Sequence, residues 1–240
     1  MPLAFRDAPF KACIFDLDGT LVDSEPGYYA SDLEFFGPRG IVIDEELNLR
    51  VMGTGTKAYM GLLAELFPDN PFCSLPLEER MRLRDGYYLE HWAPRARPFP
   101  GMAGLVSALH ARGLPLGLAS GSSRAAIDAS LGAAGLARYF SVILSCEEVA
   151  RGKPFPDIYL EAARRLGLAP AGCLVFEDGS KGLAAAKAAG MTCVALPDPA
   201  MGPPYGEAFS MADLIVAGGS GAASADYLLG LVDGLPALRA

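Results

Sequence analysis

The chain has 240 residues, of which 51% are hydrophobic and 20% are charged, and its formal net charge is −8. This length is enough for one good-sized hydrophobic core and a smaller companion domain. The acidic balance argues against nucleic acid or an anionic membrane as a partner, because most of the surface would repel either. No stretch is apolar enough to cross a bilayer, and residues 1–11 lack a signal-peptide core, so we expect a cytoplasmic protein.

The first predicted element is a short buried strand over residues 12–15, which runs directly into Asp16-Leu17-Asp18-Gly19-Thr20. Burying two carboxylates at a strand end costs free energy unless a cation or hydrogen bonds compensate them. Asp16 and Asp18 fit either a catalytic strand end or a solvated turn. The motif alone does not decide between these two interpretations, because short motifs often match by chance.

Helical signals dominate the next segment, residues 23–97. Three apolar residues with helical spacing are expected on one buried face: Tyr29, Leu33 and Phe36. Asp44 is placed to cap a second helix that extends through Leu47 and Val51, and a third helix is predicted from residue 77 to residue 92. An all-helical insert between the first two strands predicts a mobile cap domain on two linkers.

From residue 99 onward, apolar strand-like runs alternate with helical patterns. The predicted strands cover residues 116–119, 142–144, 174–176, 193–196 and 214–216. This alternation predicts an α/β fold, a doubly wound (Rossmann-like) parallel sheet formed by residues 1–22 and 98–240. Helices are expected before Gly113 and before Gly167. The run Gly218-Gly219-Ser220-Gly221 is interpreted as a flexible loop.

Three more predicted strands end in polar groups, and in a doubly wound sheet such ends meet at one edge. Ser120 and Gly121 offer a hydroxyl group and close backbone approach for an oxyanion, or simply a capping turn. Lys153 is followed by Pro154 and Pro156, which stiffen the backbone around it, and it is either a phosphate-binding ammonium or a solvated lysine. Glu177-Asp178 forms a second acidic cluster that suits Mg2+. The joint pattern favours a catalytic site over four unrelated coincidences.

Taken together, these four motifs resemble the haloacid dehalogenase-like (HAD) phosphohydrolase superfamily, in its helical-cap subgroup similar to β-phosphoglucomutase and sugar-phosphate phosphatases. The resemblance implies that Asp16 attacks phosphorus, giving an aspartyl-phosphate, while Asp18 protonates the leaving oxygen and then activates water. It implies Mg2+ as cofactor. The implied metal ligands are Asp16, the backbone carbonyl of Asp18 and Asp178, with Glu177 acting through water. Ser120, Gly121 and Lys153 would bind the phosphoryl oxygens.

An acid at position 18 separates phosphatases from the dehalogenase and phosphonatase branches, so the expected substrate is a small phosphomonoester, of sugar or polyol type. In one departure from the pattern, Gly179 stands where relatives commonly have Ser. The cap is expected to select the leaving group. Its candidate residues, each of which has packing as an alternative role, are Glu25, Tyr28, Met52, Thr54, Thr56 and Lys57.

Two other functions are alternatives to the phosphatase. A β-phosphoglucomutase-like enzyme would carry a Lys and an Arg around a Gly-Val-Ser stretch, whereas residues 50–57 read Arg-Val-Met-Gly-Thr-Gly-Thr-Lys. A non-catalytic phosphate-binding module would have lost motif residues, and here all are present. The sequence does not indicate an oligomeric state.

Overall fold

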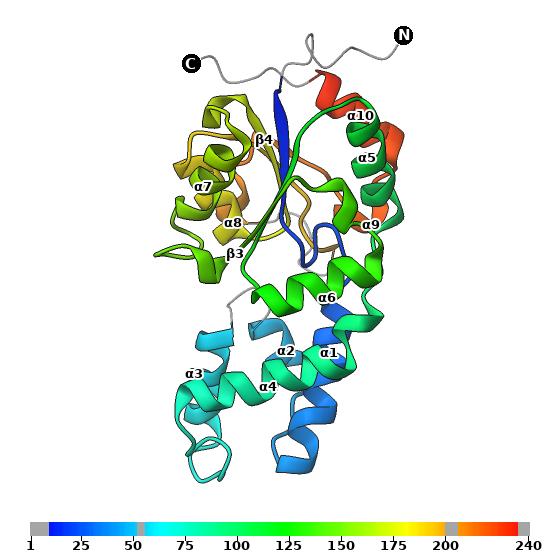
Figure 1. Ribbon diagram of the computed structural model, residues 1–240. Helices are drawn as coiled ribbons and strands as arrows, with labels where there is room; N and C mark the ends of the chain where they lie inside the picture. The colour runs from blue at the N-terminus through cyan, green and yellow to red at the C-terminus, as the bar shows by residue number, and fades with distance from the viewer. Residues whose placement is uncertain (1–9, 52–55, 200–205, 235–240) are drawn as a thin grey trace. The chain divides into compact units, whose positions relative to one another are not determined.

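The computed structural model describes residues 10–51, 56–199 and 206–234. The chain divides into two compact units. The core unit combines Met1–Asp23 with Arg97–Ala240, and the helical unit is Ser24–Ala96. Figure 1 shows the sheet of the core unit and the helices of the helical unit.

The core unit is built on a parallel sheet, in which the described residues form six strands in the order β3-β2-β1-β4-β5-β6. The strands are β1 (Ala12–Phe15), β2 (Leu116–Ser120), β3 (Val142–Ser145), β4 (Cys173–Glu177), β5 (Thr192–Ala195) and β6 (Leu214–Ile215). The predicted doubly wound α/β fold is confirmed. Because β1 lies between β2 and β4, the first acidic motif leaves the sheet at its centre, where the strand order reverses.

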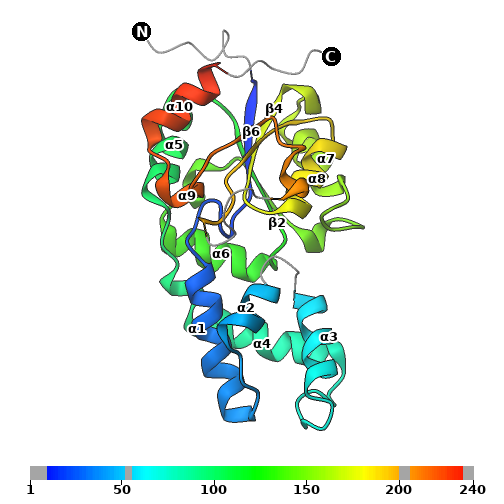
Figure 2. The same cartoon turned by 180° about the vertical axis from the view of Figure 1, so that it is seen from behind.

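Helices cover both faces of the sheet: α5, α9 and α10 on one face, α7 and α8 on the other (Figures 1 and 2). The helices of this unit are α5 (Pro100–Ala111), α6 (Arg124–Ala134), α7 (Asp157–Leu166), α8 (Ser180–Ala188), α9 (Gly219–Ala222) and α10 (Ala225–Gly234). The predicted stops after α5 and α7 are confirmed, since Gly113 and Gly167 have φ angles of 77° and 72°. Single 3-10 turns across both units are η2 (Gly37–Arg39), η3 (Ala93–Arg95), η4 (Ala137–Tyr139), η5 (Cys146–Glu148), η6 (Pro170–Gly172) and η8 (Glu207–Phe209).

The glycine-rich segment near residue 220 is not the flexible loop that its composition predicts. It forms the short helix α9, in which Gly219 and Ser220 are buried. A Cβ at Gly219 would crowd the carbonyl oxygen of Pro197. A Cβ at Gly101 on α5 would overlap the carbonyl oxygen of Ala223. Glycine is therefore required at these two positions because backbones approach closely, not because the chain is flexible.

The helical unit contains α1 (Glu25–Phe36), α2 (Glu45–Val51), α3 (Thr56–Leu66) and α4 (Leu77–His91). The predicted cap of α2 is confirmed, because the backbone N–H of Leu47 donates to Asp44 Oδ1 at 2.8 Å. This unit has an apolar core of its own, formed by Phe35, Phe36, Ile41, Ile43, Leu47, Tyr59, Met60, Leu63, Phe72 and Cys73. Among the described residues of the whole chain, no helix has the length and apolarity needed to cross a membrane.

The buried face of α1 differs from the predicted one. Leu33 is 44% exposed, whereas Asp32 on the same helix is buried. The cause is Arg84 on α4, whose Nε and Nη2 donate to the two Asp32 oxygens at 2.8 and 3.0 Å. A bidentate pair of this kind compensates the burial of both charges, and apolar spacing alone cannot reveal it.

Candidate active site

The loop after β1 places Asp16 at the carboxyl edge of the sheet. The Asp16 backbone N–H donates to the carbonyl of Phe176 on β4 at 3.0 Å, so the parallel pairing extends to the aspartate itself. Its side chain is buried. The loop turns at Gly19, whose φ of 75° and close approach to the Asp178 carboxylate both exclude a Cβ. Strand pairing and turn thus bring the two acidic motifs together.

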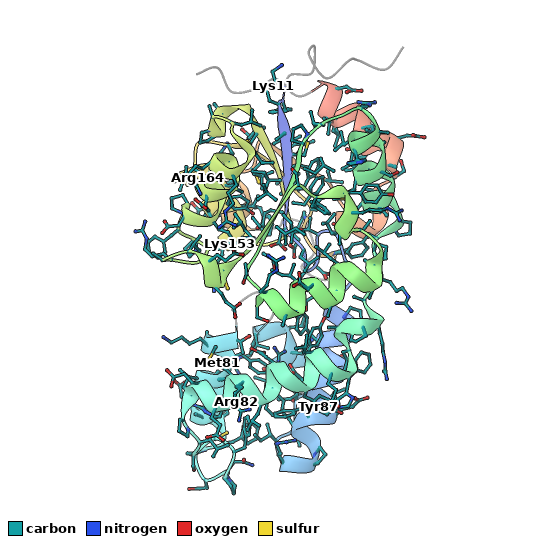
Figure 3. All side chains as sticks on the ribbon, in the orientation of Figure 1. Lys11, Met81, Arg82, Tyr87, Lys153 and Arg164 are labelled. Carbon is teal, nitrogen blue, oxygen red and sulfur yellow. The ribbon has the colours of Figure 1, made fainter. Side chains whose placement is uncertain are left out.

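Lys153 lies on the loop between β3 and α7 and joins three strand ends. Figure 3 shows it at the end of the core unit opposite Lys11. Its ammonium donates to Asp16 Oδ1 at 2.6 Å, to Glu177 Oε1 at 2.5 Å and to the Ala119 carbonyl at 3.0 Å. Burial alone would lower the pKa of Lys153, but the two carboxylates outweigh it and raise the pKa, so the lysine stays charged.

The same surroundings also raise the pKa of Asp16, which for a carboxyl group disfavours the charged form. Burial raises the pKa of its carboxyl group, Lys153 lowers it, and the neighbouring charges of Glu177 and Asp18 raise it again, to about 7. Even with Lys153 beside it, keeping Asp16 ionised therefore costs free energy when no metal ion is bound. A cation bound at these oxygens would favour the ionised form.

Glu177 is held by protein donors at both carboxylate oxygens. Oε1 accepts from Lys153 and from the Tyr159 hydroxyl, the latter at 2.6 Å, while Oε2 accepts from the Gly179 backbone N–H at 3.2 Å. Burial, and after it the charge of Glu177, raises the pKa of Tyr159, so its hydroxyl remains a donor. The sequence predicts a helix before Gly167 but does not single out Tyr159. The one general indication of this contact is that a tyrosine, when buried, needs a partner for its hydroxyl group.

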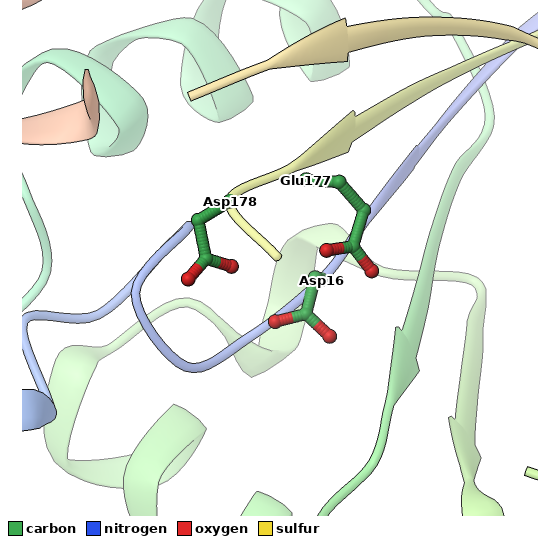
Figure 4. Close-up of side chains that lie close together, drawn as sticks. All are labelled: Asp16, Glu177 and Asp178. Carbon is green, nitrogen blue, oxygen red and sulfur yellow. The ribbon is translucent and has the colours of Figure 1, made fainter. Parts of the chain in front are cut away.

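Three carboxylates converge at this edge of the sheet, as Figure 4 shows. One oxygen from each of Asp16, Glu177 and Asp178 lies within 4.8 Å of the others. The Asp178 carboxylate also accepts a hydrogen bond of 2.9 Å from the buried Thr20 hydroxyl, a contact that the sequence analysis did not anticipate. A cluster of carboxylate oxygens with this spacing fits a hard cation such as Mg2+.

The loop after β2 brings hydroxyl groups to the same edge. Ser120 is buried at the strand end, and its Oγ accepts from the Ser122 backbone N–H at 3.0 Å. The Ser122 hydroxyl donates to Asp18 Oδ2 at 2.6 Å, another contact that the sequence did not reveal. Helix α6 begins only at Arg124 and is capped by Ser123. Ser120 therefore ends β2, and Gly121 lies on the loop ahead of the helix.

The six residues predicted to contact the leaving group belong to the helical unit. Glu25 and Tyr28 lie on α1, where the Tyr28 ring stacks on Tyr88 with 3.9 Å between centroids, and the contact of either residue with the leaving group stays a prediction. Thr56 and Lys57 begin α3. Met52 and Thr54 fall outside the described residues.

Of the core-unit residues singled out from the sequence, Asp16, Lys153, Glu177 and Asp178 thus lie together, and Asp18 is hydrogen-bonded to the loop after β2. The family model for haloacid dehalogenase-like hydrolases matches residues 10–190, more than half of the chain. The chain belongs to this family.

Named relatives narrow the class of enzyme. This haloacid dehalogenase-like hydrolase is 35% identical to protein CbbY of Rhodobacter capsulatus over 85% of the chain and 91% of the relative. It is also 35% identical to phosphoglycolate phosphatase of Escherichia coli, over 84% of the chain and 85% of that relative. CbbY from Rhodobacter sphaeroides has been solved with phosphate, and a mutant of it has been solved with xylulose 1,5-bisphosphate. Both structures are 27% identical to this chain, with a TM-score of 0.77, and the match covers 89% of this chain and 96% of that chain. The protein is a phosphoric monoester hydrolase.

Proposed function

We propose that the protein is a Mg2+-dependent phosphatase that hydrolyses a small phosphomonoester, of sugar or polyol type, through an aspartyl-phosphate. One observation carries the proposal. The buried Asp16 carboxylate accepts a 2.6 Å hydrogen bond from Lys153 and has Glu177 and Asp178 beside it. A carboxylate held next to a fixed ammonium and further anionic oxygens is suited to accept a phosphoryl group.

The acidic cluster fits Mg2+ because its donors are all carboxylate oxygens, the ligands that this ion prefers. We assign as its ligands the side chains of Asp16 and Asp178 and the backbone carbonyl of Asp18. The hydrogen bonds that Glu177 already accepts favour a role for it through water. When bound, the ion supplies positive charge that offsets the charge of the phosphoryl group.

The chain's own residues then have separate tasks. Asp16 attacks the phosphorus atom, so that its bond to a carboxylate oxygen forms as the bond to the leaving oxygen breaks. Asp18 gives a proton to that leaving oxygen and later takes one from the water that hydrolyses the aspartyl-phosphate. Ser120, Lys153 and the backbone N–H of Gly121 hold the phosphoryl oxygens. Because Lys153 is already bonded to three acceptors, its position is set before substrate binds.

The relatives support a small phosphorylated metabolite as the substrate. The R. sphaeroides CbbY mutant binds a pentulose bisphosphate, and the E. coli relative is a phosphatase of a two-carbon acid phosphate. Both are compact, highly polar esters. A sugar or polyol phosphate of similar size is the form that we propose for this chain.

The alternative, a phosphosugar mutase, would pass the phosphoryl group to a second sugar phosphate instead of water. Residues 50–57 lack the Lys and Arg around a Gly-Val-Ser stretch that such mutases carry, and the E. coli relative, which is a phosphatase, favours hydrolysis. The two activities differ in product, because a phosphatase releases phosphate steadily from a monoester. A mutase needs a sugar bisphosphate and releases little.

The decisive measurement is phosphate release from a panel of sugar, polyol and acid phosphates, with EDTA and after Mg2+ is restored. We expect turnover that EDTA abolishes and Mg2+ restores. Asp16→Asn should lose activity and form no phosphoenzyme by mass spectrometry, while Asp128→Asn, which removes an exposed carboxylate on α6, should retain both. Turnover that EDTA does not affect, or full activity in Asp16→Asn, would overturn the proposal.

Asp18→Asn separates the two aspartates. We expect this variant to lose turnover but to bind Mg2+ with nearly unchanged affinity in isothermal titration calorimetry, because the proposed contact of Asp18 with the metal is its backbone carbonyl. A large loss of Mg2+ affinity would contradict that ligand assignment.

A further inference from the structure

The Ser122 hydroxyl is bonded to the side chain that we assign as the acid and base. Its distance of 2.6 Å to Asp18 Oδ2 is typical of a hydroxyl that donates to an ionised carboxylate, about 2.5–2.7 Å. With Oδ2 bonded to Ser122, the proton that Asp18 gives to the leaving oxygen is carried on its other oxygen, Oδ1. Ser122 is thus suited to hold the Asp18 carboxyl group in one orientation.

The backbone of Ser122 is itself held on two sides. Its N–H donates to Ser120 Oγ at 3.0 Å, and its carbonyl accepts a 2.7 Å hydrogen bond from the Ser145 hydroxyl. Ser145 is fully buried at the end of β3, where it pairs in register with Ser120 on β2. Two adjacent strands of the sheet therefore determine where the Ser122 hydroxyl lies. A side chain supported in this way can orient a neighbour with little freedom of movement.

We infer that Ser122 is a positioning residue, which keeps the Asp18 carboxyl group in the orientation that protonates the leaving oxygen. The inference rests on the role of Asp18 in the proposed function. General acid catalysis contributes about 10²–10⁴-fold, and only while the acid lies within hydrogen-bond reach of its target. Removing the constraint but keeping the acid should cost part of that factor, about 10- to 100-fold.

The test compares leaving groups that differ in their need for a proton. An alkyl phosphate from the metabolite panel expels a basic alkoxide, which needs one, whereas p-nitrophenyl phosphate expels a phenolate that leaves without it. The ratio kcat/KM reports the reaction up to the aspartyl-phosphate. For Ser122→Ala we expect kcat/KM to fall about 10- to 100-fold on the alkyl phosphate and less than about threefold on p-nitrophenyl phosphate.

Matched variants separate positioning from a merely structural role. Ser122→Thr keeps the hydroxyl and should recover most of the alkyl phosphate activity, whereas Ser122→Val, which has the shape of Thr without the hydroxyl, should behave as Ser122→Ala. Ser123→Ala removes the adjacent hydroxyl, which caps α6 through Ala126, and should affect both substrates equally and weakly.

Equal losses on the two substrates in Ser122→Ala, or the same selective loss in Ser123→Ala, would overturn the inference. Asp18→Asn, assayed together with the Ser122 and Ser123 variants, shows whether the proposed role of Asp18 itself is wrong. If that variant keeps full turnover of the alkyl phosphate, or if the wild-type enzyme releases no phosphate from any ester, the proposed function itself is wrong, and the inference about Ser122 is refuted with it.

Discussion

Gly182, in the first turn of α8, leaves the space that the Glu177 carboxylate occupies. A Cβ there would come well inside 3.0 Å of that carboxylate, so Gly182→Ala must displace it. Glu177 accepts hydrogen bonds from Lys153 at 2.5 Å, Tyr159 at 2.6 Å and the Gly179 N–H at 3.2 Å, and we expect the displacement to break two of these three. Hydrogen bonds to a charged group contribute about 1.5–3 kcal/mol each, so losing two costs about 3–6 kcal/mol. Alanine gains about 1 kcal/mol in a helix, which leaves a net loss of about 2–5 kcal/mol.

The assay is urea unfolding at 25 °C, followed by circular dichroism, together with phosphatase activity. Gly132→Ala in α6 is the matched control, because nothing lies within 4 Å of a Cβ at that position, and it should be stabilised by up to about 1 kcal/mol. Activity should fall in Gly182→Ala alone, since Lys153 loses one of its acceptors. A Gly182→Ala protein as stable and active as Gly132→Ala would refute this account of Glu177.

Three further predictions use other buried polar groups. Tyr159→Phe keeps the buried ring but removes the donor to Glu177, and should lower the free energy of urea unfolding by about 1.5–3 kcal/mol; no change would show that this hydrogen bond contributes nothing. Arg84→Met leaves the Asp32 carboxylate buried without its bidentate partner and should cost about 3–5 kcal/mol, most of which an added Asp32→Leu should restore; an unaltered single variant would contradict the pairing. The pKa of Asp16 is raised to about 7, so between about pH 4 and 7 the folded protein keeps a proton that the unfolded chain has lost. In EDTA, the unfolding free energy of the wild type relative to Asp16→Asn should therefore fall as pH rises through this window, by up to about 1.4 kcal/mol per pH unit, and a difference that does not vary with pH would count against the shift.

The sheet was predictable because four of its strands, β1 to β4, combine a largely buried apolar run with polar residues at or after the strand end. Parallel strands with helices on both faces are apolar almost throughout, so runs such as Leu174–Phe176 stand out in the sequence. The carboxyl ends of such strands meet at one edge. For that reason the juxtaposition of Asp16, Lys153 and Asp178 could be expected before any contact was known.

Contacts that depend on side-chain direction could not be predicted in the same way. Tyr159 falls at helical spacing with apolar residues, and its ring is buried as that spacing implies, but its hydroxyl reaches Glu177 at the end of β4. Ser122 is one of three serines in a short loop, and only the turn geometry decides which hydroxyl reaches Asp18. Asp32 was missed because its partner is 52 residues away.

The close approach of backbones at Gly101 has a consequence for where the chain can be shortened. The family match ends at residue 190, yet α5 packs against Ala223, and a Cβ at Gly104 would also crowd Ala225. A deletion at the end of the match would remove β5 and β6 and strip the cover from this face of α5. The region that the family model matches is therefore smaller than the compact core unit of this chain, and truncated variants for assay should retain α10.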